Sequence, residues 1–281
     1  MLEKFLTRVD FTSYDDFKEN FEIIVPENFN FAWDVVDETA RESPDKTAMV
    51  WCNDKGEEAS FTFEQMRRYS NKAANFFLKA GIRKGDPVML ILKRRYEFWF
   101  CSLALNKIGA ITIPATHLLT VKDIAYRNNA AGIKMIVCVN EKETIEHVEE
   151  SEPLSPTLKY KAVISNDRKG WLNLTEGIEQ SPETFERPKG AGSTANDDIM
   201  LLYFTSGTTG MPKMVKHNYL YPVGHLVTAG YWQNVRDGGL HLTVAETGWA
   251  KAAWGKIYGQ WIAGAAVFTY DFEKFDAVKL L

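Results

Sequence analysis

Nine consecutive residues, 205–213, combine side chains that bind phosphate with glycines that let a backbone approach it. The stretch reads Thr-Ser-Gly-Thr-Thr-Gly-Met-Pro-Lys. Hydroxyl and backbone N–H groups donate hydrogen bonds to phosphate oxygens, a lysine adds a point charge, and glycines permit close approach. We therefore predict a site for the polyphosphate of a nucleotide. Its predicted residues are Thr205, Ser206, Gly207, Thr208, Thr209, Gly210 and Lys213.

The flanking residues predict that this stretch joins two strands. An apolar run at 199–204 precedes it, and 214–217 has the pattern of a second strand. The common phosphate-binding loop needs a Gly, four residues, then Gly-Lys-Ser/Thr opening a helix, and this spacing does not match. Without a helix N-terminus, the hydroxyls carry more of the binding. The alternative is a surface turn without a ligand, but such a turn needs neither nine residues nor the lysine.

Leu201–Val215 resembles the phosphate-binding signature of the adenylate-forming superfamily, which includes acyl-CoA synthetases, peptide-synthetase adenylation domains and luciferase. Phe61–Gln65 resembles the early box of that family, which begins a helix. Leu103–Ala110, with Pro114, resembles its second box. Ala245–Ala265 is similar to the fourth-box region of acetyl- and medium-chain acyl-CoA synthetases, which favours the synthetases over the peptide-synthetase branch.

The resemblance implies a two-step ligase that uses ATP, Mg²⁺ and coenzyme A. A carboxylate attacks the α-phosphate to give an acyl-adenylate, and the coenzyme A thiol then attacks the activated carbonyl. The catalytic lysine, the adenine and metal ligands and the C-terminal domain of such relatives, which are about twice as long, would lie beyond Leu281. No catalytic residue or metal ligand is therefore assigned. Two alternatives stay open: an enzyme that loads a carrier protein, and a catalytically silent nucleotide-binding fragment.

The resemblance also suggests residues for the carboxylic acid substrate. Trp249 lies in the box that lines the acyl site in relatives, and His217 follows the phosphate stretch by four residues. Glu246 stands where many relatives have aspartate, which puts any specific role of its carboxylate in doubt. Arg94 and Arg95 could meet an anionic cofactor, but a solvated loop is the favoured interpretation.

Periodicity predicts alternating strands and helices. Thr62 and Gln65 form a capping-box pattern that begins a helix extending to Ala80, and Gly81 suits a left-handed helix end. Further helices are predicted at about 96–108, 120–132 and 141–150, and strands at 88–92, 110–113, 133–139, 160–164, 199–204 and 214–217. The predicted fold class is α/β, with layered parallel-sheet subdomains and helices on both faces.

Composition excludes several function classes. The net charge is −4 without a basic block, which argues against nucleic acid and anionic membrane partners, and no apolar stretch approaches membrane-spanning length. Three distant cysteines show no metal spacing and fit reduced, buried thiols. Because the N-terminus has no signal-peptide core, the expected location is cytoplasmic. The family resemblance implies a small carboxylic acid as the expected partner.

The resemblance predicts that residues 1–81 and 230–281 form one subdomain and 82–229 the other, with the C-terminal domain absent. Phe275, Val278 and Leu281 recur at steps of three, as in an apolar helix face that has just begun. We therefore expect a truncated N-terminal domain that is weakly active or inactive alone. The apolar surface left open would favour a homo-oligomer.

Overall fold

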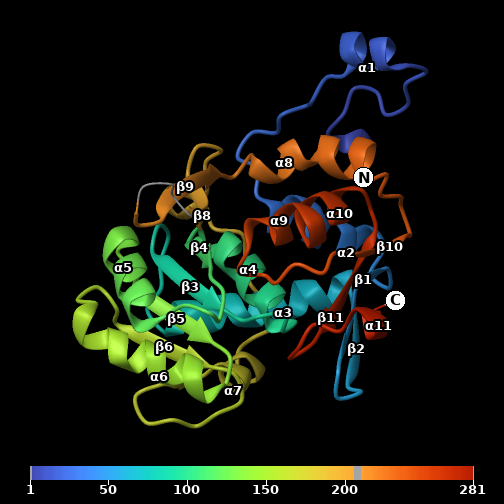
Figure 1. Cartoon of the computed structure of the whole chain (residues 1–281). Helices are drawn as coiled ribbons and strands as arrows, with labels where there is room; N and C mark the ends of the chain where they lie inside the picture. The colour runs from blue at the N-terminus through green and yellow to red at the C-terminus, as the bar shows by residue number, and fades with distance from the viewer. Residues whose placement is uncertain (1, 206–209, 281) are drawn as a thin grey trace.

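The structure is a computed structural model that describes residues 2–205 and 210–280. Within them the strands form two sheets (Figure 1). The seven-stranded sheet has the order β7 (Leu172–Asn173), β6 (Tyr160–Val163), β5 (Met135–Cys138), β3 (Pro87–Ile91), β4 (Ile111–Pro114), β8 (Ile199–Thr205) and β9 (Lys213–Asn218). The four-stranded sheet has the order β10 (Leu240–Leu242), β11 (Ala266–Asp271), β1 (Thr47–Asn53) and β2 (Glu58–Thr62).

Both sheets are mixed but mostly parallel. Two neighbouring pairs are antiparallel, β8 with β9 and β1 with β2. The other strand pairs recorded in the described residues are parallel. The predicted parallel sheets are therefore largely confirmed. The two antiparallel pairs are the places where a short connection joins strands directly, because a parallel pair needs a long crossover.

The predicted capping signals set the helix ends. Helix α3 (Phe63–Lys79) begins with a capping box between Thr62 and Gln65, and Gly81 takes a φ of +96° just after it. Helix α4 (Glu97–Ile108) ends at left-handed Gly109, and α5 (Val121–Ala131) has a Thr120 cap. Helix α6 (Lys142–Ser151) is the predicted acidic helix, whose inner face buries Ile145 and Val148.

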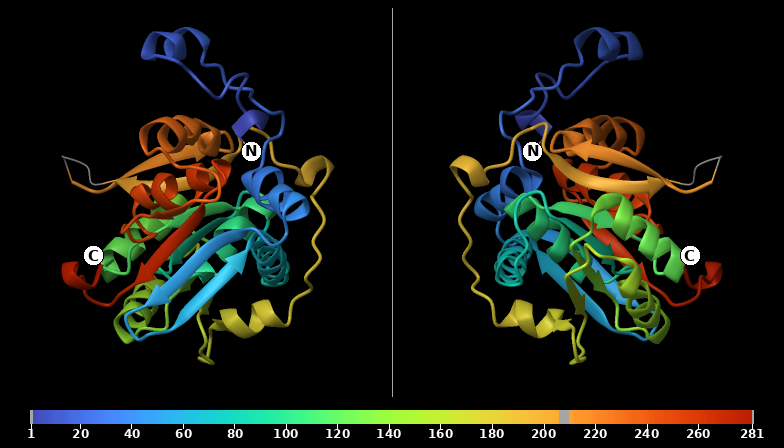
Figure 2. Two further views of the ribbon diagram at one scale, coloured as in Figure 1. Left: turned by 90° about the vertical axis from the view of Figure 1, so that its right-hand side faces the viewer. Right: turned by 90° about the vertical axis from the view of Figure 1, so that its left-hand side faces the viewer.

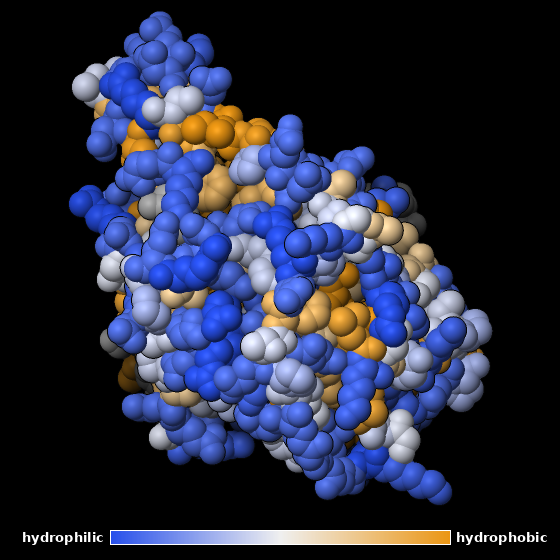
Figure 3. Space-filling view, turned by 180° about the vertical axis from the view of Figure 1, so that it is seen from behind, coloured by the Kyte–Doolittle hydropathy of each residue, from blue (hydrophilic) through white to orange (hydrophobic). Residues whose placement is uncertain are grey.

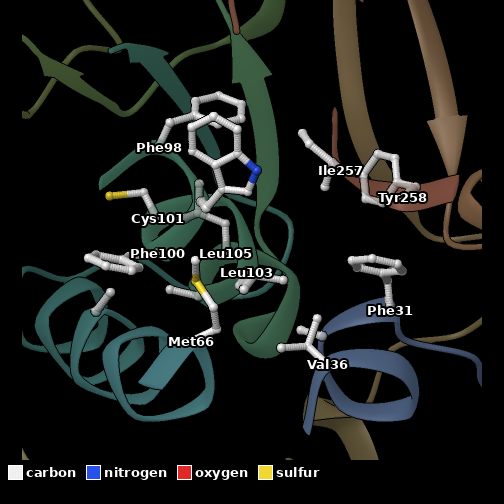
Figure 4. Packing of buried hydrophobic residues seen from close by; sticks show 14 of the residues in the cluster. Phe31, Val36, Met66, Phe98, Phe100, Cys101, Leu103, Leu105, Ile257 and Tyr258 are labelled. Carbon is white, nitrogen blue, oxygen red and sulfur yellow. The ribbon is translucent and has the colours of Figure 1, made fainter. Parts of the chain in front are cut away.

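Helices cover both faces of the seven-stranded sheet. On one face, Ile136 and Ile113 pack with Ile124 of α5 and Val148 of α6. On the other, α4 is buried along its whole length between the two sheets (Figure 1). In that core Phe98, Phe100 and Leu103 of α4 lie between Met66 of α3 on one side and Phe31, Ile257 and Tyr258 on the other (Figure 4). This packing explains why α4 lacks a polar face.

The remaining elements form the outer parts of the molecule. The segment 181–198, which contains only the 3-10 turn η4 (Gly190–Gly192), runs along the outside before β8 (Figure 2). An N-terminal arm carrying α1 (Tyr14–Asn20) stands away from the body (Figure 1). The other helical elements are η1 (Leu2–Lys4), η2 (Ala32–Asp37), α2 (Glu38–Glu42), η3 (Glu152–Leu154), α7 (Leu174–Glu179), α8 (Tyr221–Leu226), η5 (Val227–Trp232), α9 (Ala250–Lys256), α10 (Tyr258–Ile262) and α11 (Ala277–Leu280).

The sheet composition bears on the predicted subdomains. The four-stranded sheet takes its strands from 47–62 and 240–271, and the seven-stranded sheet takes its strands from 87–218. The division into 1–81 with 230–281 and 82–229 stays a prediction, which this composition supports. An aromatic stripe in the sequence consists of Trp249, Trp254, Tyr258 and Trp261. It does not lie on one helix, because α9 ends at Lys256 and Ile257 breaks the helical conformation before α10.

Candidate active site

The phosphate-binding stretch joins β8 to β9. Thr205 pairs with Lys213 at the last step of this antiparallel ladder, so the two ends of the stretch are held opposite each other. Gly210 has a φ of +124°, a conformation that residues with a side chain rarely adopt. Thr205, Gly210 and Lys213 are thus placed by the structure. The predicted ligands Ser206, Gly207, Thr208 and Thr209 lie outside the described residues.

Lysine side chains on β9 supply positive charge beside this stretch. Lys213 and Lys216 are exposed, and neither has an ion-pair partner among residues 2–205 and 210–280. An exposed, unpaired ammonium group beside a hydroxyl-rich stretch is the donor set that a polyphosphate needs. The residues present therefore fit a nucleotide triphosphate.

The sheet topology places other loops at the same edge. Strands β3, β4 and β8 are parallel neighbours, so the residues after each strand meet at one edge of the sheet. The chain leaves β3 for β4 on one side and then returns to β5 on the other side of β3. In open α/β sheets, ligands bind at the carboxyl ends of the strands where the strand order reverses. Thr205, after β8, lies at such an edge.

The fourth-box residues are anchored to this edge. The backbone N–H of Thr247 donates to the Lys93 carbonyl at 3.1 Å, and the Thr247 hydroxyl donates to the same oxygen. A Cβ atom on Gly248 would lie 2.3 Å from the backbone nitrogen of Thr116, so only glycine fits there. Residues 246–248 therefore pack between the residues that follow β3 and those that follow β4.

Glu246 is a buried carboxylate with a defined set of partners. It accepts hydrogen bonds from the Thr116 hydroxyl at 3.0 Å and the His117 backbone N–H at 3.2 Å. Its carboxylate oxygen Oε1 also lies 3.3 Å from the His117 ring nitrogen Nδ1. Burial would raise the pKa of Glu246, but His117 and Thr116 together outweigh it and the pKa is lowered. Glu246 thus ties the fourth-box segment to the end of β4 as an anion.

The Trp249 side chain is exposed to solvent at this edge. It forms the N-cap residue of α9, and 57% of it is exposed. Of the aromatics that follow, Tyr258 and Trp261 are buried in the core, whereas Trp254 is half-buried and packs near Trp232. A contact between Trp249 and an acyl group stays a prediction, and its exposure leaves the ring free to make one.

His217 lies four residues along β9 from the end of the stretch, opposite Leu201. At about 3.3 Å per residue, this distance is roughly 13 Å. Its ring packs on Tyr221, with 4.0 Å between centroids, and Tyr221 in turn meets His225 edge-on at 4.5 Å. Burial lowers the pKa of His217 and that of His225, the latter to about 4. The structure does not bring His217 beside Lys213, and its substrate role stays a prediction.

Arg94 and Arg95 do not form the expected solvated loop. Arg95 pairs with Asp271 at 2.6 Å, and the guanidinium of Arg94 lies 4.0 Å from the centroid of the Phe272 ring. Both side chains are half-buried against the four-stranded sheet because residues 271–273, distant in sequence, fold back beside β3. The expectation that they lie in a solvated loop was therefore wrong.

Sequence reasoning missed the contact between His117 and Glu246. Nothing in the local sequence around His117 links it to a carboxylate 129 residues away. Of the cysteines, Cys101 and Cys138 are buried as predicted, and burial raises the pKa of both thiols, whereas Cys52 is half-buried.

A groove beneath the N-terminal arm is separate from this sheet edge. A cavity of about 820 Å³ lies between the arm and η5, with Phe11, Phe17 and Tyr231 in its walls. The hydrophobic surface seen from behind includes this region below the arm (Figure 3). The predicted phosphate-binding residues Thr205 and Lys213 and the anchored carboxylate of Glu246 lie at the sheet edge, so we place the candidate active site there.

The described residues offer neither a cluster of metal ligands nor a membrane-spanning helix. Among them no group of three or more His, Cys, Asp or Glu side chains is arranged to hold a metal ion. No helix in this part of the chain is both long and apolar enough to cross a membrane.

Comparisons with known proteins agree with this architecture. The chain is 34% identical over 283 residues to the mitochondrial acyl-coenzyme A synthetase ACSM3 of Pongo abelii, covering 98% of this chain and 47% of that protein. It is 36% identical over 272 residues to ACSM4 of Mus musculus, covering 93% and 46%. The chain thus spans about half the length of these curated relatives.

Solved structures show the same fold. The Brucella canis acyl-CoA synthetase matches with a TM-score of 0.77 at 20% identity, covering 89% of this chain and 44% of that one. The anthranilate CoA ligase AuaEII, in complex with anthranoyl-AMP, matches with a TM-score of 0.76 at 23% identity, covering 88% and 46%. Residues 36–281 match the family model described as AMP-binding enzyme, and the chain belongs to this family.

Proposed function

We propose that this chain supplies the nucleotide-binding half of an ATP-dependent carboxylic acid–CoA ligase. The observation that carries the proposal is the hairpin of β8 and β9, which holds Thr205 opposite Lys213 with exposed, unpaired lysines beside it. Family membership and the acyl-coenzyme A synthetases among its relatives support the same reaction. The proposed sequence is formation of an acyl-adenylate, with release of pyrophosphate, followed by transfer of the acyl group to the coenzyme A thiol, with release of AMP.

The residues of the stretch would bind and orient the triphosphate. Hydroxyls and backbone N–H groups from 205–210 would donate to the β- and γ-phosphates, and Lys213 would neutralise charge that develops on the leaving pyrophosphate. Glycines at 207 and 210 allow the backbone to approach the phosphates. Mg²⁺, when bound, would neutralise part of the negative charge of the triphosphate. No carboxylate of this chain is assigned to it.

The carboxylic acid would bind at the same sheet edge. Trp249 is exposed there, next to the segment that Glu246, Thr247 and Gly248 anchor. The relatives named acyl-coenzyme A synthetases support a carboxylic acid as the substrate. His217 is retained as a second candidate, which would need to act from farther along β9.

Two other functions remain candidates. A carrier-protein-loading enzyme would use the same first step and differ only in the thiol acceptor. A catalytically silent nucleotide-binding chain is favoured for these 281 residues alone, because they contain no residue assigned as the catalytic lysine of the family. Measuring acyl transfer to coenzyme A and to a pantetheinylated carrier protein separates the carrier-protein-loading enzyme from the ligase.

The proposal also includes a cytoplasmic location and a homo-oligomer. We retain a cytoplasmic location, which reduced and largely buried cysteines support, although the relatives are named as mitochondrial proteins. Exposed apolar side chains, including Trp232, Trp249 and Val278, support self-association. Sedimentation that shows only monomer at high concentration would contradict the assembly.

The first experiment measures nucleotide binding by this chain. Isothermal titration with MgATP, inorganic tripolyphosphate and AMP should show that MgATP and tripolyphosphate bind and compete, and that AMP binds more weakly. This order follows because the stretch is proposed to recognise the β- and γ-phosphates. Equal affinity for ATP and AMP, or no competition by tripolyphosphate, would contradict the proposal. Acyl transfer is then tested with carboxylic acids in a chain extended to the length of its relatives.

A further inference from the structure

One turn of α5 contacts both arms of the β8–β9 hairpin. The Tyr126 hydroxyl donates a hydrogen bond to the Pro212 carbonyl oxygen at 2.9 Å, and its ring meets the Phe204 ring at a centroid distance of 6.2 Å and an interplanar angle of 71°. The next residue, Arg127, places its guanidinium carbon 5.2 Å from the centroid of the same Phe204 ring. Phe204 is the residue before the last one of β8, and Pro212 directly precedes Lys213, the first residue of β9.

The returning arm has little other support. β9 is an edge strand that pairs only with β8, and Lys213, Met214, Val215 and Lys216 are all exposed. Within the described residues 210–216, the bond from Tyr126 is the hydrogen bond recorded from outside the hairpin. The position of Pro212 relative to the sheet edge therefore depends on α5.

Helix α5 is itself firmly held. A capping box between Thr120 and Asp123 fixes its first turn. Ile124 is buried against the seven-stranded sheet, and the Asn128 side chain donates to the Ser155 hydroxyl at 2.9 Å. A donor on such a helix can define the position of a neighbouring carbonyl, because these contacts anchor the helix independently of the hairpin.

We propose that Tyr126 is a positioning residue for the phosphate-binding stretch, acting through its hydrogen bond to Pro212. This inference rests on the proposed function and adds a residue to it. The hydroxyl fixes the peptide before Lys213, so the ammonium group is presented at the sheet edge before the nucleotide arrives. Pre-organisation of this kind strengthens binding because less conformational freedom is lost when the ligand binds.

The variant Tyr126→Phe isolates this role. It removes the hydroxyl and keeps the ring that packs on Phe204. The matched control is Tyr231→Phe, which removes a hydroxyl that donates to the Val9 carbonyl at 2.7 Å in the N-terminal arm. Each substitution deletes one hydrogen bond from a tyrosine hydroxyl to a backbone carbonyl, and only Tyr126 lies beside the β8–β9 hairpin.

Two measurements test the variants. The first is the rate of trypsin cleavage after Lys213 without nucleotide, with the site identified by mass spectrometry. Loss of one hydrogen bond should raise this rate about three- to tenfold in Tyr126→Phe. The second is the dissociation constant for MgATP, which should rise by a similar factor while that for AMP stays unchanged. Tyr231→Phe should match the wild type in both.

The outcomes separate this inference from the proposed function. Wild-type cleavage and wild-type MgATP affinity in Tyr126→Phe would overturn the positioning role and leave the phosphate site standing. A wild-type chain that fails to bind MgATP would overturn the proposed function. In that case, faster cleavage in Tyr126→Phe would still support the control of Pro212 by Tyr126, and unchanged cleavage would refute it.

Discussion

The carboxylate of Glu246 lies 3.3 Å from Nδ1 of His117 and accepts the backbone N–H of the same residue, across a sequence separation of 129 positions. The contact joins the end of β4 to the segment that carries Trp249. The contact therefore links Trp249, the predicted substrate residue, to the sheet edge where β8 leads into the predicted phosphate-binding stretch.

Replacing Glu246 should destabilise the fold in a pH-dependent way. The pKa of Glu246 is lowered in the folded state, so its stabilisation is present above the unfolded value of about 4.5 and lost as pH falls through the folded pKa. Glu246→Gln should lower the free energy of unfolding by about 1–3 kcal/mol at pH 7. Urea unfolding at pH 7, 5 and 4 should show a constant deficit down to pH 5 and a smaller one at pH 4. A deficit that does not shrink at pH 4 would contradict the ionic role.

Replacing Lys256 should stabilise the fold. Its side chain is fully buried, and its Nζ has no hydrogen-bond partner in the described part of the chain. Burial, followed by repulsion from Arg94, lowers the pKa of Lys256 to about 7. The unfolded chain then binds more protons between pH 7 and 10.5, so wild-type stability rises with pH over that range.

Lys256→Met should therefore raise the free energy of unfolding by roughly 1–3 kcal/mol at pH 7, and by less at pH 9. Denaturant unfolding at both pH values measures this difference. The control is Lys251→Met on the same helix, where the lysine is exposed and the change should stay within about 0.5 kcal/mol. A loss of stability in Lys256→Met would indicate a partner for the ammonium group.

Gly248→Ala should displace the fourth-box segment. The added Cβ would meet the Thr116 backbone at 2.3 Å, and backbone cannot move away as a flexible side chain can. We expect a loss of about 1–3 kcal/mol in the free energy of unfolding. Gly224→Ala in α8 is the control, since a Cβ there meets nothing within 4 Å and should stabilise the helix by up to about 1 kcal/mol. Equal effects at the two sites would exclude the close approach at Gly248.

Lys213→Ala should weaken nucleotide binding. Loss of a charged donor to phosphate should raise the MgATP dissociation constant about tenfold or more. In a chain extended to the length of the relatives, pyrophosphate release should fall by roughly tens- to thousand-fold. Lys216→Ala, an exposed lysine three residues farther along β9, should have a smaller effect. Wild-type turnover in Lys213→Ala would remove Lys213 from the site.

The local sequence predicted several elements to within one or two residues. The helix that begins at Thr62 and the one that ends at Gly109 were predicted from caps and from glycine, because these signals act over a single turn. The antiparallel direction of β9 and the division of the aromatic stripe at Ile257 were not predicted. Both depend on packing against residues that lie far away in the chain.

By itself, the sequence predicted a phosphate-binding role for residues 205–213 and determined the alternation of strands and helices, because donor types, glycine spacing and hydrophobic periodicity are local properties. Only the tertiary structure decided which distant groups meet at the sheet edge: Glu246 with His117, Thr247 with Lys93 and Tyr126 with Pro212. These contacts join segments brought together by parallel strand order and burial of a shared core, and no short-range pattern encodes such a meeting.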